Sequence, residues 1–215
     1  MINGIIKRIS STIASLLISI AKNGENRREK IESVFEGLLW DIVILIPIYT
    51  ISTFLGLLPL TISVHASRNI LKTRAFGLHC RKARNCTIIS TILLIGVPYV
   101  VRWFGFGISN LGVALAFAAV IVTMHRYAPA DIEARPIAGV KRRARLKDAA
   151  VTRSVVLMVV AMILLPINEG SWSLLVTIGA IFQGLSIHPF VYKLLGRQWD
   201  NYLQIKKMSE DVCTL

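Results

Sequence analysis

The sequence predicts an all-α integral membrane protein: a polytopic helical bundle of about six membrane segments, preceded by an N-terminal amphipathic helix on the membrane surface. The 215-residue chain is 54% hydrophobic, with a mean hydropathy of +0.61, whereas soluble domains are about 45–50% apolar. The apolar residues fall in runs of about 14–25, which is long enough to cross a hydrocarbon core. The basic residues lie between these runs, as expected of a membrane protein.

Charge and cysteine content narrow the function classes. The formal net charge is +13, but a basic surface for nucleic acid would not be divided among apolar spans. The placement fits the positive-inside rule and an anionic lipid surface instead. The three cysteines lack the spacing of a zinc site or of a disulfide framework. We therefore expect reduced thiols, with no metal, no cofactor and no nucleic-acid partner.

We expect a single membrane domain, residues 1–215, with three regions. Residues 1–36 form an amphipathic and linker region, because apolar residues at helical spacing alternate with Lys7, Arg8 and Lys22 before a mixed-charge stretch. Residues 37–195 form the membrane bundle. Residues 196–215 are a polar cytoplasmic tail.

Four later spans are predicted at 87–104, 108–125, 154–167 and 171–195, with the longest polar connection at 126–153. The first apolar stretch, 37–63, is ambiguous because Gly56–Pro59 interrupts it. It is either one span, or the first arm of a hairpin whose polar second helix runs from Pro59 to about Thr73.

The division of Lys and Arg residues between the two sides of the membrane favours the hairpin. With six crossings, every Lys and Arg except Arg102 lies on one side of the membrane. A single span would instead move the basic residues of the N-terminal 36 positions across. The positive-inside rule therefore favours the hairpin, with both termini in the cytoplasm. Both alternatives keep residues 77–86 and the 126–153 connection on the cytoplasmic side.

The segment GLHCRKARNC at 77–86 holds the candidate chemistry. Imidazole can take a thiol proton and later return it, so His79 and Cys86 suffice for cysteine nucleophilic catalysis. The basic residues around them, including Arg81, favour the thiolate. Seven residues of straight helix would separate the two by about 10.5 Å along its axis. The pair therefore requires a break in the helix between or just before them, for which Gly77 is the best candidate.

A lone Cys/His pairing is also compatible with other functions. The segment could be a basic loop with incidental thiols. The protein would then be a peptide exporter, or a membrane scaffold that recruits partners through its basic loops. An exporter should have a more continuous polar path than the spans at 87–104 and 154–167 offer.

Two motifs together carry a family resemblance. Gly77, His79 and Cys86, followed after two spans by RYAPADIEARPI at 126–137, resemble the accessory gene regulator B (AgrB) family of membrane peptidases that process quorum-sensing pro-peptides. The resemblance covers nearly the whole chain. It departs from the family pattern at Cys80, where alanine is usual, so a second thiol adjoins the proposed base.

The resemblance implies a cysteine endopeptidase in the cell membrane of a Gram-positive bacterium, and a homodimer. Cys86 would attack a backbone carbonyl of an AgrD-type precursor, with His79 as base and then acid. The C-terminal fragment would leave, and an internal Cys or Ser would attack the resulting thioester. A thiolactone or lactone ring would be released.

Seven further positions are candidates for substrate binding: Gly77, Arg81, Asn85, Asp131, Lys141, Arg142 and Arg143. Asn85 is a candidate oxyanion donor beside the nucleophile. Asp131 either orients a base or belongs to a structural loop that closes the bundle. The basic run at 141–147 either holds the acidic end of the precursor or anchors the protein to anionic lipid.

Overall fold

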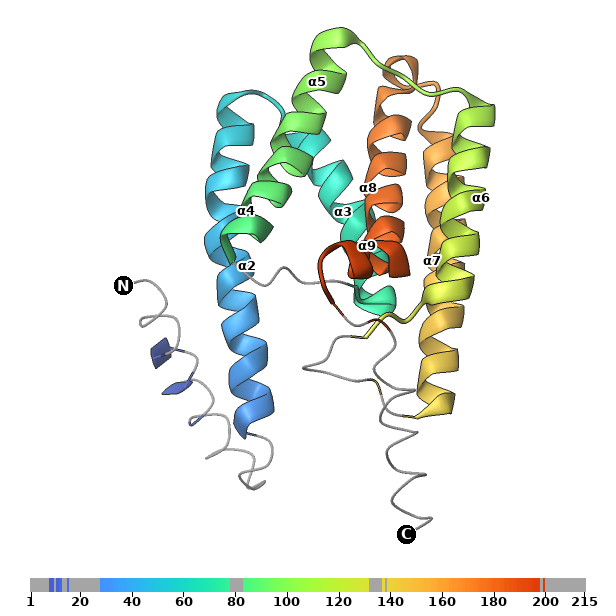
Figure 1. The fold of residues 1–215 in the computed structure, drawn as a ribbon. Helices are drawn as coiled ribbons and strands as arrows, with labels where there is room; N and C mark the ends of the chain where they lie inside the picture. Colours follow the sequence, from blue (N-terminus) through green and yellow to red (C-terminus); the bar gives the residue numbers. More distant parts are fainter. Residues whose placement is uncertain are drawn as a thin grey trace. The chain divides into compact units, whose positions relative to one another are not determined.

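The computed structural model describes residues 8–9, 11–12, 15, 28–77, 83–131, 137, 139–197 and 199 (Figure 1). Within these ranges every named element is a helix, and the single extended pairing is an isolated bridge between Phe76 and Ala130. The all-α prediction is confirmed. The chain divides into two compact units, Met1–Leu55 and Gly56–Leu215, and each is described by itself.

In the first unit, the structure describes a few residues of the N-terminal segment and one long helix. The described residues of the N-terminal segment, from Arg8 to Ser15, are helical. Helix α2 spans Arg28–Phe54 and includes Pro47. It therefore begins inside the region expected to be a linker. The apolar part of α2 is Leu39–Phe54.

The second unit begins with the polar return helix that the sequence predicts. Helix α3 spans Leu58–Ala75, with Pro59 in its first turn, where a missing N–H costs nothing. Its buried residues recur every three or four positions, so one face is covered: Thr61, Val64, Ser67, Leu71 and Ala75. The break at Gly56–Pro59 therefore separates two helices, as the hairpin alternative requires.

A π-helical turn joins α4 to α5. Helix α4 spans Ala83–Thr91, the π turn spans Ile92–Gly96, and α5 spans Val97–Phe104. Pro98 has no N–H to donate to the carbonyl of Leu94 four residues earlier. The Thr61 hydroxyl of α3 donates to that carbonyl instead, at 2.7 Å. A buried hydroxyl thus satisfies the acceptor that the proline leaves open.

Helices α6 and α7 pack against each other. Helix α6 spans Asn110–Tyr127, and the Ser109 side chain caps it by accepting from the Gly112 N–H at 3.2 Å. Helix α7 spans Val140–Ile163. The basic run at 141–147 is therefore helical, and α7 begins 14 residues before the span predicted at 154–167. Leu146 and Ala150, buried one turn apart, show why: the run has an apolar face.

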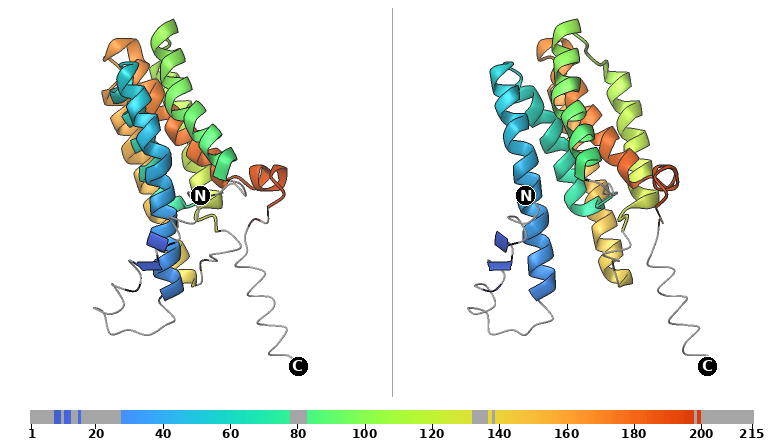
Figure 2. Two further views of the ribbon diagram at one scale, coloured as in Figure 1. Left: turned by 90° about the vertical axis from the view of Figure 1, so that its left-hand side faces the viewer. Right: turned by 60° about the vertical axis from the view of Figure 1, so that its left-hand side comes forward.

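Helix α8, Ser171–Ile187, packs against α3, α6 and α7 (Figure 2). A Cβ at Gly179 would lie 2.0 Å from Ser67 Oγ, so only glycine allows α8 to approach α3 this closely. A 3-10 turn, Asn168–Gly170, precedes α8, and a short helix α9, Pro189–Leu194, follows it. The span predicted to reach residue 195 ends at Ile187, because His188 is extended before Pro189.

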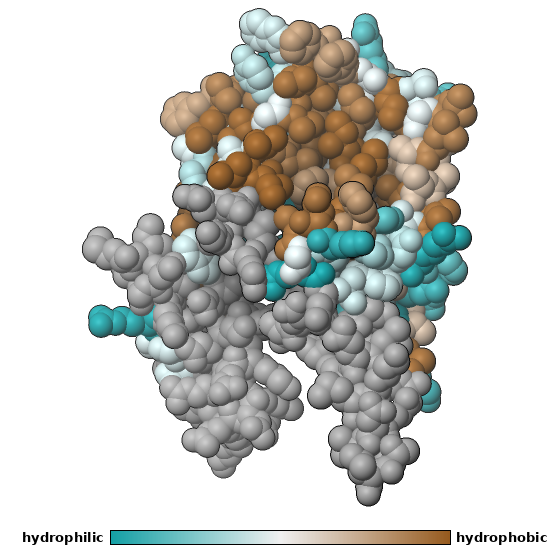
Figure 3. All heavy atoms as spheres, in the orientation of Figure 1, coloured by the Kyte–Doolittle hydropathy of each residue, from teal (hydrophilic) through white to brown (hydrophobic). Residues whose placement is uncertain are grey.

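Among the described residues, two helical stretches are long and apolar enough to cross a membrane: Thr87–Phe104 and Asn110–Tyr127. Large apolar side chains are exposed along both, including Trp103, Leu111 and Leu115. The space-filling view shows apolar side chains gathered over much of the visible face of this unit, and polar ones toward one end (Figure 3).

Candidate functional site

The chain turns sharply where α3 ends at Ala75, four residues before His79. Phe76 has φ 57° and Gly77 has φ 128°, so the helical conformation stops at Ala75. A Cβ at Gly77 would lie 2.8 Å from Ser186 Oγ and 3.3 Å from Gln183 Nε2, both on α8. Glycine is therefore required at position 77 for its backbone conformation and for this close approach. The break predicted at Gly77 is present.

The same turn contacts the second motif. The Ala130 N–H donates to the Ala75 carbonyl at 2.9 Å, and Phe76 pairs with Ala130 in the isolated bridge. The buried amide of Gln183 donates from Nε2 to the Phe76 carbonyl. We call residues 75–77, residues 129–131 and Gln183 the motif junction. It joins three segments that are far apart in sequence.

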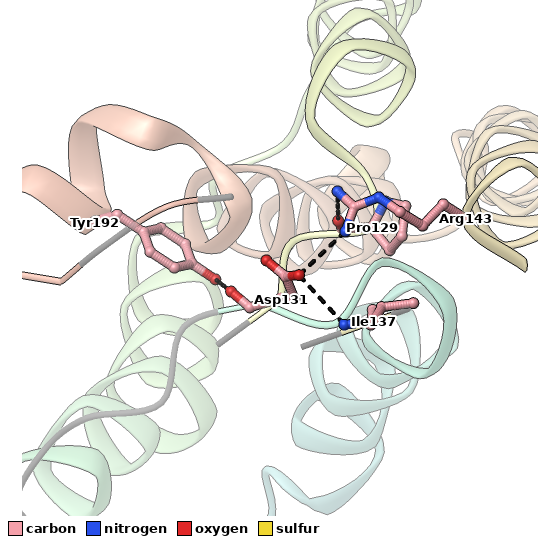
Figure 4. A network of polar contacts seen from close by, with 5 residues as sticks. All are labelled: Pro129, Asp131, Ile137, Arg143 and Tyr192. Carbon is pink, nitrogen blue, oxygen red and sulfur yellow. Dashed lines mark hydrogen bonds and ion pairs between the residues drawn. The ribbon is translucent and has the colours of Figure 1, made fainter. Parts of the chain in front are cut away.

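A buried carboxylate fixes residues 129–131 (Figure 4). Asp131 is 2% exposed. Its Oδ2 accepts from Arg143 Nη1 at 3.1 Å and from the Ile137 N–H at 3.3 Å. Arg143 also donates from Nη2 to the Pro129 carbonyl at 3.4 Å. Arg143 therefore holds both Pro129 and Asp131 to the start of α7, so Asp131 belongs to a structural network.

Tyr192 closes this network from α9, beyond the end of α8. Its hydroxyl donates to the Asp131 carbonyl at 3.4 Å, and Figure 4 shows the ring reaching the loop from the side opposite Arg143. Burial raises the pKa of Tyr192 above its ordinary value, and the nearby Asp131 charge raises it further. The hydroxyl therefore stays protonated and available as a donor.

The structure places the predicted site residues unevenly. Gly77, Asp131 and Arg143 lie in or beside the motif junction. Lys141 and Arg142 are exposed in the first turn of α7. The backbones of Asn85 and Cys86 lie in the first turn of α4, while their side chains are outside the described part of the chain. His79, Cys80 and Arg81 also lie outside the described residues.

Sequence reasoning missed Gln183 and Tyr192. Gln183 carried a usable signal, because it is an amide within an apolar helix, and such a side chain must find a partner when buried. Nothing in the sequence pattern indicated a role for Tyr192. The turn at His188, which brings α9 back to the Pro129–Asp131 segment, cannot be predicted from hydropathy. Both residues act on the backbone of the two motifs.

Comparisons with known proteins identify the family of the chain. The family model for accessory gene regulator B matches residues 6–187. An AgrB-like protein of Listeria welshimeri is 35% identical over 196 residues, covering 90% of this chain and 94% of the relative. One from Clostridium acetobutylicum is 30% identical, covering 89% and 91%.

A more distant relative carries the family's own name. Accessory gene regulator protein B of Staphylococcus intermedius is 26% identical over 141 residues, covering 66% of this chain and 71% of the relative. No solved structure matches the chain. The extent of the family match and the identity to the Listeria protein are decisive: the chain belongs to the accessory gene regulator B family.

Proposed function

We propose that this protein is a multi-pass membrane cysteine endopeptidase that cleaves an AgrD-type precursor peptide and releases a cyclic product for quorum sensing. The observation that carries the proposal is the motif junction. The Ala130–Ala75 hydrogen bond ties the segment before His79 to the Pro129–Asp131 loop. Two motifs from distant parts of the chain thus meet where the proposed nucleophile's own segment begins.

The proposed first step is acylation of Cys86. His79 takes the Sγ proton, and the thiolate attacks a backbone carbonyl carbon of the precursor, forming a C–S bond. The resulting tetrahedral intermediate collapses by breaking its C–N bond. The imidazolium of His79 returns the proton to the leaving amine. The products are a thioester on Cys86 and a free C-terminal fragment.

The second step closes the ring. His79 takes the proton of a Cys or Ser side chain within the retained peptide, and that side chain attacks the thioester carbonyl carbon. The C–S bond to Cys86 then breaks, and the imidazolium of His79 returns the proton to the Cys86 thiolate. A thioester and a thiolactone have similar energies, so cyclisation needs no nucleotide if water is kept away from the acyl-enzyme. A site near the apolar spans supplies that exclusion.

Recognition of the precursor is assigned to the basic start of α7. Arg143 is engaged with Asp131, whereas Lys141 and Arg142, which immediately precede it, are exposed. Exposed cations attract a carboxylate-rich peptide segment and steer its approach. We therefore assign binding of the acidic precursor tail to Lys141 and Arg142, and positioning of the loop to Arg143.

The decisive experiment uses the full chain in liposomes with an AgrD-type precursor. Wild-type protein should release a C-terminal fragment and, with a slowly cyclising precursor, accumulate an adduct that hydroxylamine cleaves. Cys86→Ala and His79→Ala should abolish both products. Cys80→Ala is the matched thiol control and should retain them.

The contrary outcomes are distinct. Fragment release by Cys86→Ala, or its loss in Cys80→Ala alone, would overturn the site assignment. Transport of the uncleaved precursor into vesicles would favour an exporter instead.

Six crossings with both termini and the active site in the cytoplasm complete the proposal, along with a homodimer. Labelling of single cysteines placed in the N-terminal region, at the exposed Phe106 and in the C-terminal tail tests the topology. Only the cysteine at position 106 should react with an impermeant reagent added outside cells. Crosslinking of the liposome-embedded protein tests the dimer.

A further inference from the structure

A basic cleft lies between α3 and α7, separate from the motif junction. It has a volume of about 760 Å³ and is open to the surface. Five residues line it, and none of the five is acidic: Asn69, Ile70, Thr73, Arg74 and Arg153. Two guanidinium groups therefore lie at one opening. Guanidinium donors suit a phosphate-bearing ligand.

Hydrogen bonds to α3 fix the position of the Arg153 side chain. It lies on α7, and its Nη1 donates to the Ile70 carbonyl at 2.8 Å and to Thr73 Oγ1, both on α3. These bonds use one of its terminal nitrogens, so the donors on Nη2 and Nε are left for a ligand. Arg74, in the last turn of α3, is exposed and adds a second cation.

Apolar side chains continue from the cleft along both helices. On α3, Ile70, Ala66 and Ile62 follow one another at four-residue intervals, and all three are exposed. On α7, Val156 and Val160 follow Arg153 by three and seven residues, and both are exposed. The two helices pack against each other, so they present one apolar strip that leads away from the basic opening.

We propose that this cleft binds the phosphate of an anionic membrane lipid, with an acyl chain lying along the apolar strip. A phosphate ion matches the cleft but not the strip, and an apolar partner matches the strip but not the cleft. A lipid matches both. Basic pockets between membrane helices bind anionic headgroups in this way. The bound lipid would bridge α3, which leads into the motif junction, and α7, which carries Arg143.

The test is native mass spectrometry of the full chain in detergent, titrated with dioleoylphosphatidylglycerol or dioleoylphosphatidylcholine. We expect saturable binding of the anionic lipid and at least about tenfold weaker binding of the zwitterionic one, since each basic residue contributes about 1 kcal/mol near anionic lipid. The double variant Arg74→Gln/Arg153→Gln should lose about tenfold or more in affinity for the anionic lipid.

Matched controls separate a site from diffuse charge. Arg126→Gln/Lys193→Gln removes the same charge from exposed positions outside the cleft and should leave binding unchanged. Arg74→Gln alone leaves the Arg153 bonds intact and should weaken binding even if the double variant folds poorly. An equal loss in the control pair would overturn the proposal.

The source of the phosphate is distinguished by competition. Inorganic phosphate at millimolar concentration should not displace the lipid, because it lacks the acyl chains. Displacement would overturn the lipid assignment and leave a simple anion site. Binding of a second copy of the chain that excludes lipid would overturn it as well. None of these outcomes depends on peptidase activity.

Discussion

The two ends of the bundle formed by α3, α6, α7 and α8 are closed by different kinds of contact. At the end where α6 and α8 begin, backbone lies directly on backbone. A Cβ at Gly107 would lie 1.9 Å from the Glu169 carbonyl oxygen, and one at Gly170 would lie 2.7 Å from that of Ile108. We call residues 106–108 and 169–171 the glycine junction.

At the opposite end, the motif junction is held by polar side chains that reach across from other helices. Gln183 donates to Phe76, and Arg143 pairs with Asp131. Buried polar networks of this kind fix geometry, and they are costly when left half satisfied. The glycine junction closes the fold, whereas the motif junction positions a particular piece of backbone. Substitutions at the two ends should therefore separate stability from processing.

Among substitutions at the two junctions, the largest effect on processing is expected from Gly77→Ala. The new Cβ would clash with Ser186 and would have to adopt a φ of 128°, so the segment leading to His79 must shift. Displacement of a catalytic group by about 1 Å can cost about 100-fold in rate. Fragment release in liposomes should fall by about that factor.

Ser186 offers the matched control for this prediction. Ser186→Ala alone should process normally, and Gly77→Ala/Ser186→Ala should recover only part of the rate, because the clash is relieved and the backbone strain is not. Full recovery in the double variant would show that φ at position 77 does not matter.

Asp131→Asn should have the next largest effect. It removes the charge that pairs with Arg143, whose side chain is 20% exposed. Breaking such a pair costs about 3 kcal/mol in the free energy of unfolding, and the loosened loop should lower processing about tenfold. Thermal unfolding in detergent and fragment release measure the two effects. Asp148→Asn, an exposed acid on α7, should change neither.

Gln183→Leu should have a moderate effect. It keeps the volume but leaves the Phe76 carbonyl without its donor, at a cost of about 1–3 kcal/mol in the free energy of unfolding. Processing should fall severalfold, with an unchanged apparent affinity for the precursor, because the residue positions the backbone and does not touch substrate. Ser171→Ala removes a side chain to backbone bond to Phe106 at the glycine junction, so it is the comparison. Equal loss of processing in both variants would contradict the positioning role.

Gly107→Ala should have the smallest effect on the processing rate of the folded protein. The clash with Glu169 should lower the midpoint of thermal unfolding clearly, since it is between two backbone segments. Rates normalised to the folded fraction should remain close to wild type. A strong drop in normalised rate would mean that the two ends are coupled through α6 or α8.

Hydropathy and turn residues predicted the helical class and most helix positions. Gly56–Pro59 marked the break before α3, and Gly77 marked the break after it. The start of α7 was missed because the charges in 141–147 hide an apolar face, visible only through Leu146 and Ala150. Hydropathy does not mark the end of α8, because apolar residues continue past Pro189 into α9.

The contacts of the site could be predicted only in part. Spacing singled out Gly77 and Asp131, but it does not show that Ala130 bonds to Ala75, because that pairing joins segments 55 positions apart. The role of Arg143 was ambiguous for the same reason: its partner lies across a loop. Long-range pairings depend on how the helices pack. The pairs of residues that contact one another across helices cannot be inferred from the pattern of a single sequence.

The π turn at Ile92–Gly96 has a consequence for reading the helix that carries Cys86. Five residues are accommodated there where an α-helix would place about four, so the side chains before the turn are rotated by about 100° relative to an uninterrupted α-helix. A helical wheel drawn from Cys86 through Phe104 therefore assigns the wrong face to one half. Deleting one residue from this turn would rotate position 86 about the helix axis by about 100° relative to α5 without changing any residue next to it in sequence.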